Sequence, residues 1–163
     1  MLKVKYFAYG SNISIKRLKN RVESIFDLLT PGIPYTLENY ELIFNAGSTW
    51  GPWAFANIQP KKGSKVEGIL YDMSPSQFKK LDGYEILYDK HYFQIDKNTL
   101  GCVYIANNEN ITIRPKKPTL EYLNIIIDGC KETGLINTYN SLIDYKIKNF
   151  KIKKSKHSKK FKF

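Results

Sequence analysis

The chain has 163 residues, 42% of them apolar and 14% aromatic, which is enough for one domain with a buried core. This composition excludes disorder for most of the chain, and no apolar run approaches the roughly 20 residues that span a membrane. The net charge is +11, but residues 146–163 contain nine lysines and no acidic residue, so subtracting them leaves only +2 for residues 1–145. A basic face for nucleic acid is therefore not expected on the body of the protein.

The N-terminal segment predicts a strand, a glycine turn and a helix. Residues 1–9 are largely β-branched, aromatic or small and apolar, as in a buried strand. Gly10 follows, and Ser11 or Asn12 is suited to cap the helix expected over residues 14–22. These elements together aim backbone N–H groups at one point, which suits an anionic or carbonyl oxygen. Taken alone, the pattern also fits a strand that ends in an ordinary turn.

The middle of the chain predicts several short strands and one helix. The helix begins with Ser74 as its N-cap, Pro75 at its first position and Gln77 completing a capping box. The Pro-Lys-Lys-Gly sequence of residues 60–63 predicts a hairpin-like connection between two strands. The expected strands are residues 24–29, 40–44, 54–58, 66–71, 92–95 and 101–105.

Beyond Pro118 the pattern changes to helix. Apolar residues recur at three- and four-residue spacing from Leu120 to Cys130, which predicts one amphipathic helix. Gly134 stands where a C-terminal cap belongs. The apolar residues among 142–147 predict a last helix.

Strands first and helices last indicate an α+β domain over residues 1–147, with its sheet curled into a small barrel. Residues 148–163 predict a Lys-rich tail that is solvated or disordered. Cys102 and Cys130 are too few for a disulfide framework and are expected to be buried thiols. The basic segment beginning at Lys16 interrupts any signal-peptide core, so a cytoplasmic location is expected.

Few residues are available for catalysis. The chain has no Cys/His metal spacing, no G-x-S-x-G elbow and no phosphate-binding G-x-x-x-x-G-K, and its two histidines, His91 and His157, are expected to be solvated. Glu85 remains, surrounded by apolar and aromatic residues after the helix that begins at Ser74. Such neighbours would raise the pKa of Glu85 and make it a proton acceptor near neutral pH. A glutamate at a helix end is also common as a purely structural feature.

Four blocks of sequence, in order, resemble the γ-glutamylcyclotransferase family (AIG2-like). The family signature F-A-Y-G-S-N is found at residues 7–12. Its V-x-G-x-(V/L)-(Y/W) strand resembles residues 66–71, and its L-D-x-x-E-G…Y segment resembles residues 81–85 followed by Tyr92. Its P-S-x-x-Y ending is similar to residues 118–122. The resemblance covers nearly the whole expected domain.

The resemblance implies a small mixed β-barrel with flanking helices and an intramolecular reaction. In that reaction the α-amine of a γ-glutamyl compound attacks its own γ-carbonyl, giving 5-oxoproline and expelling an amine or amino acid, so that no metal or cofactor is needed. Glu85 is implied as the base that takes the amine proton and returns it to the leaving nitrogen. A glutamate has an ordinary pKa of about 4.3 and an α-amine one of about 7.8, so this proton transfer is uphill by ~5 kcal/mol. Because burial would raise the pKa of Glu85 and reduce this cost, Glu85 is expected to be buried.

The remaining site residues that the resemblance implies bind the substrate. The loop of residues 9–12 is implied to hold the substrate carboxylate or the developing oxyanion through backbone N–H groups. The tyrosine of the last block is implied to hydrogen-bond the γ-glutamyl group, and the tyrosine after Glu85 to line the same pocket. These substrate-binding residues are Tyr9, Gly10, Ser11, Asn12, Tyr92 and Tyr122.

The chain departs from the family pattern at three positions. Asn57 stands where threonine is common, and Thr119 stands for serine. Ile86 replaces the glycine after the implied catalytic Glu85. A β-branched residue does not easily replace a glycine at positive φ, so Ile86 predicts an altered turn unless its φ is ordinary.

Two alternatives remain open at this point. The substrate could be a γ-glutamyl amine or a carrier-bound γ-glutamyl group, because no motif identifies the leaving group. The chain could instead be a non-catalytic module that binds a small ligand, with its basic tail placed on nucleic acid or an anionic membrane. Both a monomer and a homodimer are compatible with the sequence.

Overall fold

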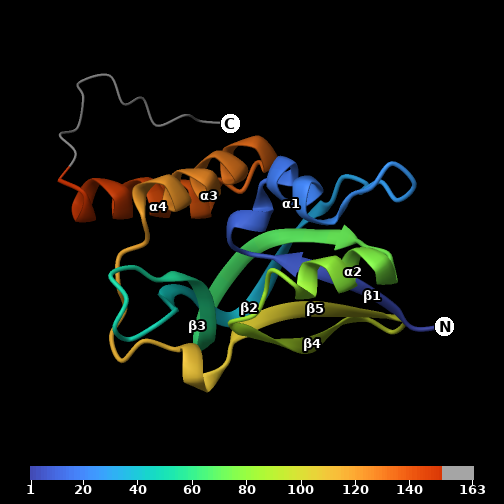
Figure 1. Ribbon diagram of the computed structural model, residues 1–163, viewed down its shortest axis with the longest axis horizontal. Helices are drawn as coiled ribbons and strands as arrows, with labels where there is room; N and C mark the ends of the chain where they lie inside the picture. Colours follow the sequence, from blue (N-terminus) through green and yellow to red (C-terminus); the bar gives the residue numbers. More distant parts are fainter. Residues whose placement is uncertain (152–163) are drawn as a thin grey trace.

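The computed structural model describes residues 1–151, which form one mixed five-stranded sheet with helices packed against it (Figure 1). The strand order is β2-β3-β1-β5-β4, with β1 antiparallel to β3 and parallel to β5. The outer pairs, β2 with β3 and β4 with β5, are antiparallel. The elements are β1 (Lys3–Ala8), the 3-10 turn η1 (Ser11–Ile13), α1 (Ile15–Val22), β2 (Ile33–Ala46), β3 (Phe55–Asp72), α2 (Pro75–Asp82), β4 (Tyr88–Asp96), β5 (Thr99–Ala106), the 3-10 turn η2 (Asn108–Asn110), α3 (Leu120–Thr133) and α4 (Ile136–Asn149).

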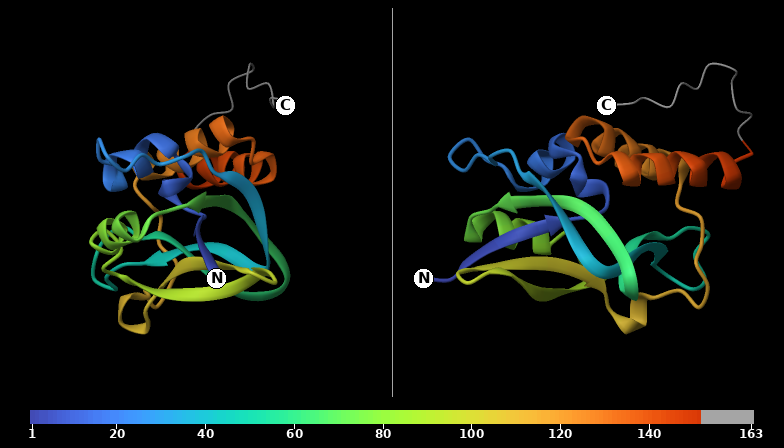
Figure 2. Two further views of the ribbon diagram at one scale, coloured as in Figure 1. Left: turned by 90° about the vertical axis from the view of Figure 1, so that its right-hand side faces the viewer. Right: turned by 180° about the vertical axis from the view of Figure 1, so that it is seen from behind.

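The α+β class is confirmed, but the term barrel applies only loosely. The sheet is not closed, because β2 and β4 are its two edges and do not pair with each other. Its curvature is nevertheless strong, and the long strand β3 arches from the helical layer down to the lower strands (Figure 2). The curl leaves one side of the central strand β1 facing the helices.

The two strands predicted over residues 54–58 and 66–71 are parts of one continuous strand, β3. The segment between them is a bulge, not a hairpin, in which residues 61–64 face the single residue Asn39 of β2. Asn39 and Gly63 both have positive φ, and the Gly63 N–H donates to the Asn39 Oδ1 at 3.0 Å. Turn-forming residues therefore serve a bulge here, because β2 is long enough to pair on both sides of it.

The strand predicted over residues 24–29 is wrong. This segment is a loop that closes on itself through a bridge between Ser24 and Asp27. Ile25 and Phe26 project from it and are 83% and 92% exposed. Among residues 1–151, this apolar run pairs with no strand of the five-stranded sheet.

The turn after β1 differs in detail from its prediction. The helix expected over residues 14–22 is α1, but its N-cap is Ser14, whose Oγ accepts a hydrogen bond from the Arg17 N–H at 3.3 Å. Ser11 and Asn12 do not cap it; they form η1 and are buried. The polar residues after Gly10 are therefore held inside the protein.

The other helices follow their sequence signals. The capping box of Ser74 and Gln77 is present at the start of α2, with Pro75 in its first turn. Gly134 ends α3 in the left-handed conformation, at φ 73°. The last helix, α4, extends to Asn149, slightly beyond the predicted end of the domain.

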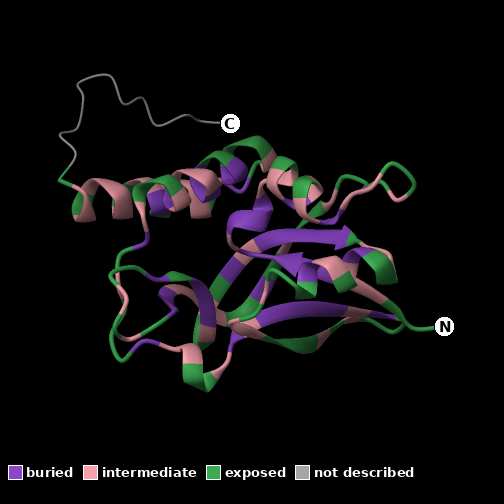
Figure 3. Cartoon of the chain, in the orientation of Figure 1, coloured by how far each residue is buried: buried purple, intermediate pink, exposed green. Residues whose placement is uncertain are grey.

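Helices α1, α3 and α4 lie over one side of the sheet, as both side views show (Figure 2). Buried residues line β1, β3, β5 and the facing sides of these helices (Figure 3). α3 packs directly on η1, and Gly129 permits this approach, since a Cβ there would lie 2.8 Å from the Ser14 backbone nitrogen. The loop that follows β1 is thus held between the sheet and α3.

The remaining predictions concern single residues and the C-terminal tail. Cys102 and Cys130 are buried free thiols, and His91 is exposed, each as predicted. Residues 152–163 of the predicted tail, including His157, lie outside the described part of the chain. The predicted binding of this tail to nucleic acid or membrane therefore stays a prediction. Within residues 1–151, no helix is both long and apolar enough to cross a membrane.

Candidate active site

A cavity of about 360 Å³ opens between the loop after β1, helix α1 and the segment that follows α2. Its walls combine buried aromatic rings with a few polar side chains, the usual character of a small-molecule site. Six of the seven site residues predicted from the sequence line it: Tyr9, Gly10, Ser11, Asn12, Glu85 and Tyr122.

Glu85 is placed by the turn that ends α2. Its N–H donates to the carbonyls of Leu81 at 3.2 Å and Asp82 at 3.3 Å, which ties the turn to the last residues of α2. Leu81 is fully buried and anchors this end of α2 in the core. The side chain of Glu85 therefore lines the cavity, while its neighbour Ile86 is 77% exposed.

The side-chain amide of Asn12 orients the carboxyl group of Glu85. Its Nδ2 donates to the Tyr6 hydroxyl at 2.9 Å and to the Glu85 Oε1 at 3.3 Å. Its Oδ1 accepts a hydrogen bond from the Arg21 Nη1 at 3.0 Å. Because an amide donates only from nitrogen and accepts only at oxygen, the contact with Arg21 fixes which end faces Glu85.

Burial dominates the electrostatics of Glu85. Desolvation raises the pKa of its carboxyl group to about 7. The charges of Arg21 and Arg17 and the hydrogen bond from Asn12 oppose this rise, whereas the nearby Asp82 carboxylate adds to it. A group with this pKa can both accept and release a proton near neutral pH.

Two tyrosines hold the backbone of Ala56 in the cavity wall. The Ala56 N–H donates to the Tyr122 hydroxyl at 3.2 Å, and the Tyr88 hydroxyl donates to the Ala56 carbonyl at 2.8 Å. Burial raises the pKa of both phenols, so they stay neutral at physiological pH. Gly10 keeps this end of the cavity open, since a Cβ there would lie 3.3 Å from that of Ala56 and 3.5 Å from the Tyr122 hydroxyl.

The sequence family described as gamma-glutamyl cyclotransferase, AIG2-like, matches residues 6–124. The chain belongs to this family. The matched segment runs from β1 into α3 and contains every residue that lines the cavity.

Named relatives agree with this assignment. Gamma-glutamyl cyclotransferase gliK of Aspergillus fumigatus is 26% identical over 168 residues, an alignment that covers 85% of this chain but 60% of that protein. Gamma-glutamylcyclotransferase of Homo sapiens is 30% identical over 146 residues, covering 80% of this chain and 71% of the human protein. A solved structure named gamma-glutamyl cyclotransferase superposes with a TM-score of 0.66 at 26% identity, covering 98% of this chain and 93% of that one.

The structure accounts for two positions at which the chain departs from the γ-glutamyl cyclotransferase pattern, Ile86 and Asn57. Among non-glycine residues 1–151, only Asn39 and Lys151 have positive φ, so Ile86 sits in an ordinary conformation and the family glycine is not needed. Asn57 is buried. Its Nδ2 donates to the Asn45 Oδ1 at 2.9 Å, and its Oδ1 accepts a hydrogen bond from the Ala106 N–H at 2.9 Å. It ties three segments of the fold together behind the cavity.

The prediction that Tyr92 lines the same pocket as Glu85 is wrong. Tyr92 lies on β4 opposite Cys102, is 57% exposed, and borders a different surface depression. Tyr88, at the start of β4, lines the cavity instead. Four residues of a strand cover about 13 Å, which carries Tyr92 well past the site.

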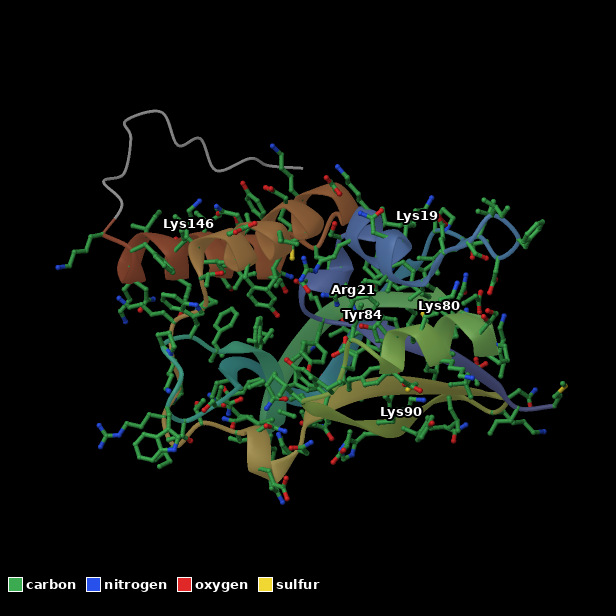
Figure 4. All side chains as sticks on the ribbon, in the orientation of Figure 1. Lys19, Arg21, Lys80, Tyr84, Lys90 and Lys146 are labelled. Atoms are coloured by element: carbon green, nitrogen blue, oxygen red, sulfur yellow. The ribbon has the colours of Figure 1, made fainter. Side chains whose placement is uncertain are left out.

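Sequence reasoning also missed two arginines in the cavity wall. Arg17 and Arg21 stand four residues apart on α1 and so share the face that borders the cavity. The guanidinium of Arg21 lies 4.9 Å from the ring centre of Tyr84, next to it in Figure 4. The four-residue spacing of Arg17 and Arg21 within a correctly predicted helix could have indicated that both face the same side as the loop after β1.

Proposed function

We propose that this protein is a γ-glutamyl cyclotransferase that releases 5-oxoproline from small γ-glutamyl amino acids or peptides. The observation that supports this most directly is the carboxyl group of Glu85, which is desolvated in the cavity, is bonded to Asn12 and has a pKa of about 7. Family membership supports the same reaction class.

The reaction needs only groups that the substrate and Glu85 supply. The α-amine nitrogen attacks the γ-carbonyl carbon and closes a five-membered ring, and the bond from that carbon to the leaving nitrogen breaks. The α-ammonium nitrogen loses two protons on its way to the ring N–H, and the leaving nitrogen gains two to become an ammonium. Glu85 is proposed to relay these protons one at a time, and no water is consumed. Holding the substrate in a folded conformation can contribute roughly 7–11 kcal/mol to such an intramolecular step.

The raised pKa of Glu85 makes the first proton transfer inexpensive. An α-amine has a pKa of about 7.8, so transfer to a carboxylate of pKa about 7 is uphill by only ~1 kcal/mol. An unperturbed glutamate would make the same transfer uphill by ~5 kcal/mol. Burial of this side chain therefore supports its assignment as the base.

The loop after β1 is proposed to bind the charged and developing oxygens of the substrate. Within η1 the Ile13 N–H donates to the Gly10 carbonyl and the Ser14 N–H to the Ser11 carbonyl, at 3.0 and 3.2 Å. The N–H groups of Ser11 and Asn12 precede these bonds in the first turn, where a helix leaves its donors unused. Such donors suit an oxyanion in a cavity that excludes water.

The test measures 5-oxoproline after the purified protein is incubated with a panel of γ-glutamyl dipeptides and γ-glutamyl amines. Glu85→Gln is expected to lower kcat by about 100- to 10,000-fold, because the amide keeps the shape but cannot take the proton. Glu132→Gln, at an exposed position of α3 outside the cavity, serves as the matched control and is expected to behave as the wild type.

Two results would contradict the proposal. Turnover by Glu85→Gln near the wild-type rate would remove Glu85 as the base. No 5-oxoproline from any substrate of the panel, with a protein that is folded by circular dichroism, would remove the activity itself.

A further inference from the structure

Arg17 is a cation in the cavity wall whose hydrogen bonding is incomplete. Its Nε is buried, and among residues 1–151 no group accepts a hydrogen bond from it. The nearby acidic residue of α3, Glu121, is exposed and does not line the cavity. Arg17 also lines the cavity and, among residues 1–151, forms no salt bridge, so its guanidinium is available to a carboxylate of a bound ligand.

The charges in the cavity match a substrate with two carboxylates. The wall contains two guanidinium groups, Arg17 and Arg21, and one carboxyl group, Glu85. Once Glu85 has taken the amine proton it is neutral, so two positive charges remain. A γ-glutamyl amino acid at this stage carries two carboxylates, whereas a γ-glutamyl amine carries one.

The two arginines occupy different places relative to Glu85. Arg21 donates a hydrogen bond to Asn12, whose amide in turn donates to Glu85. The charge of Arg21 lowers the pKa of the Glu85 carboxyl group more than that of Arg17 does. The glutamyl carboxylate is attached to the carbon that bears the reacting amine, so it must lie beside Glu85 and within reach of Arg21. Arg17 lies four residues earlier, about 6 Å along α1, and interacts electrostatically with Tyr122.

On the basis of the proposed function, we propose that Arg17 binds the carboxylate of the leaving amino acid. This contact makes the enzyme prefer γ-glutamyl amino acids and peptides over γ-glutamyl amines. The planar guanidinium can place two N–H donors on one carboxylate, which a lysine cannot do.

Two substrates that differ by a single carboxylate test this role: γ-L-glutamyl-L-alanine and γ-L-glutamyl-ethylamine. The wild type is expected to have a kcat/KM at least about 10-fold higher for the alanine compound. Measured at about pH 9, where Glu85 is ionised in both proteins, Arg17→Gln is expected to lose about 10- to 100-fold with the alanine compound and to change by no more than about 3-fold with the ethylamine compound. Lys16→Gln removes an exposed charge from the same helix and is expected to leave both values unchanged.

A second variant guards against a folding defect. Arg17→Lys keeps the charge but not the planar pair of donors, and it is expected to lose activity only with the alanine compound, by less than Arg17→Gln. Equal losses on both substrates, or a wild type without preference for the alanine compound, would overturn the role of Arg17 while 5-oxoproline release leaves the proposed function standing. No release by the wild type from either compound or from any other substrate of the panel would overturn both.

Discussion

The carboxyl group of Glu85 is set between opposing influences. Burial favours its protonated form, while Arg21, Arg17 and the amide of Asn12 favour the ionised form. The balance leaves its pKa at about 7, close to that of the amine whose proton it is proposed to take. Small changes around Glu85 are therefore expected to appear first in the pH dependence of turnover.

Since only ionised Glu85 can accept a proton, kcat/KM is expected to fall as the pH drops below about 7. Arg21→Gln removes a positive charge that stabilises the carboxylate, so the midpoint of this acidic limb is expected to move to higher pH. Arg21→Lys keeps the charge and is expected to shift the midpoint less. A pH profile of kcat/KM for the three proteins measures this, and a midpoint that moves to lower pH in Arg21→Gln would contradict it.

Single residues also set the limit of sequence reasoning about the site. Glu85 and the loop of residues 9–12 could be found because they carry a contiguous family signature. Tyr92 was assigned to the cavity in place of Tyr88, because the sequence does not show at which residue the strand β4 leaves the cavity. That the Arg17 Nε has no acceptor among residues 1–151 could not be recognised without the packing around it.

At the scale of elements, the site depends on how α3 packs against the loop after β1. Gly129 stands at this contact, where a Cβ would lie 2.8 Å from the Ser14 backbone nitrogen and 3.2 Å from Ile13. Gly129→Ala is expected to displace η1 and lower the free energy of unfolding by about 1–3 kcal/mol, with a loss of kcat/KM.

Urea unfolding and the 5-oxoproline assay measure the two effects of Gly129→Ala. Asp128→Ala, at the neighbouring exposed position of α3, is the control and is expected to change stability by no more than about 0.5 kcal/mol. A Gly129→Ala protein as stable and active as the wild type would mean that α3 does not position the loop.

Local signals predicted elements well where they act within a few residues. The capping box of Ser74 and the left-handed cap at Gly134 are both in place. The predictions for residues 24–29 and 60–63 were wrong for different reasons. A strand needs a partner to pair with, and a turn-forming sequence does not show whether the chain reverses there or only bulges. Among residues 1–151 the first segment pairs only with itself, and the second lies opposite β2, which continues past it.

At the scale of the whole molecule, the site residues and most of the positive charge lie in different parts of the sequence. All residues that line the cavity lie between Tyr6 and Tyr122, and the family match ends at residue 124. The nine lysines of residues 146–163 account for most of the net charge of +11. The proposed contacts to the substrate carboxylates come from Arg17 and Arg21, which line the cavity.

A chain that ends at residue 151 is accordingly expected to keep its kcat/KM within about 2-fold on any substrate that the full chain turns over, because it retains every element that forms the cavity. It is also expected to unfold at the same urea concentration, since α4 remains complete. The comparison should be made at low and at physiological salt, because long-range attraction of an anionic substrate by the lysines would be screened at the higher ionic strength. A rate that falls on truncation only at low salt would assign steering of the substrate to the lysines, and a fall at both would place part of the substrate site beyond residue 151.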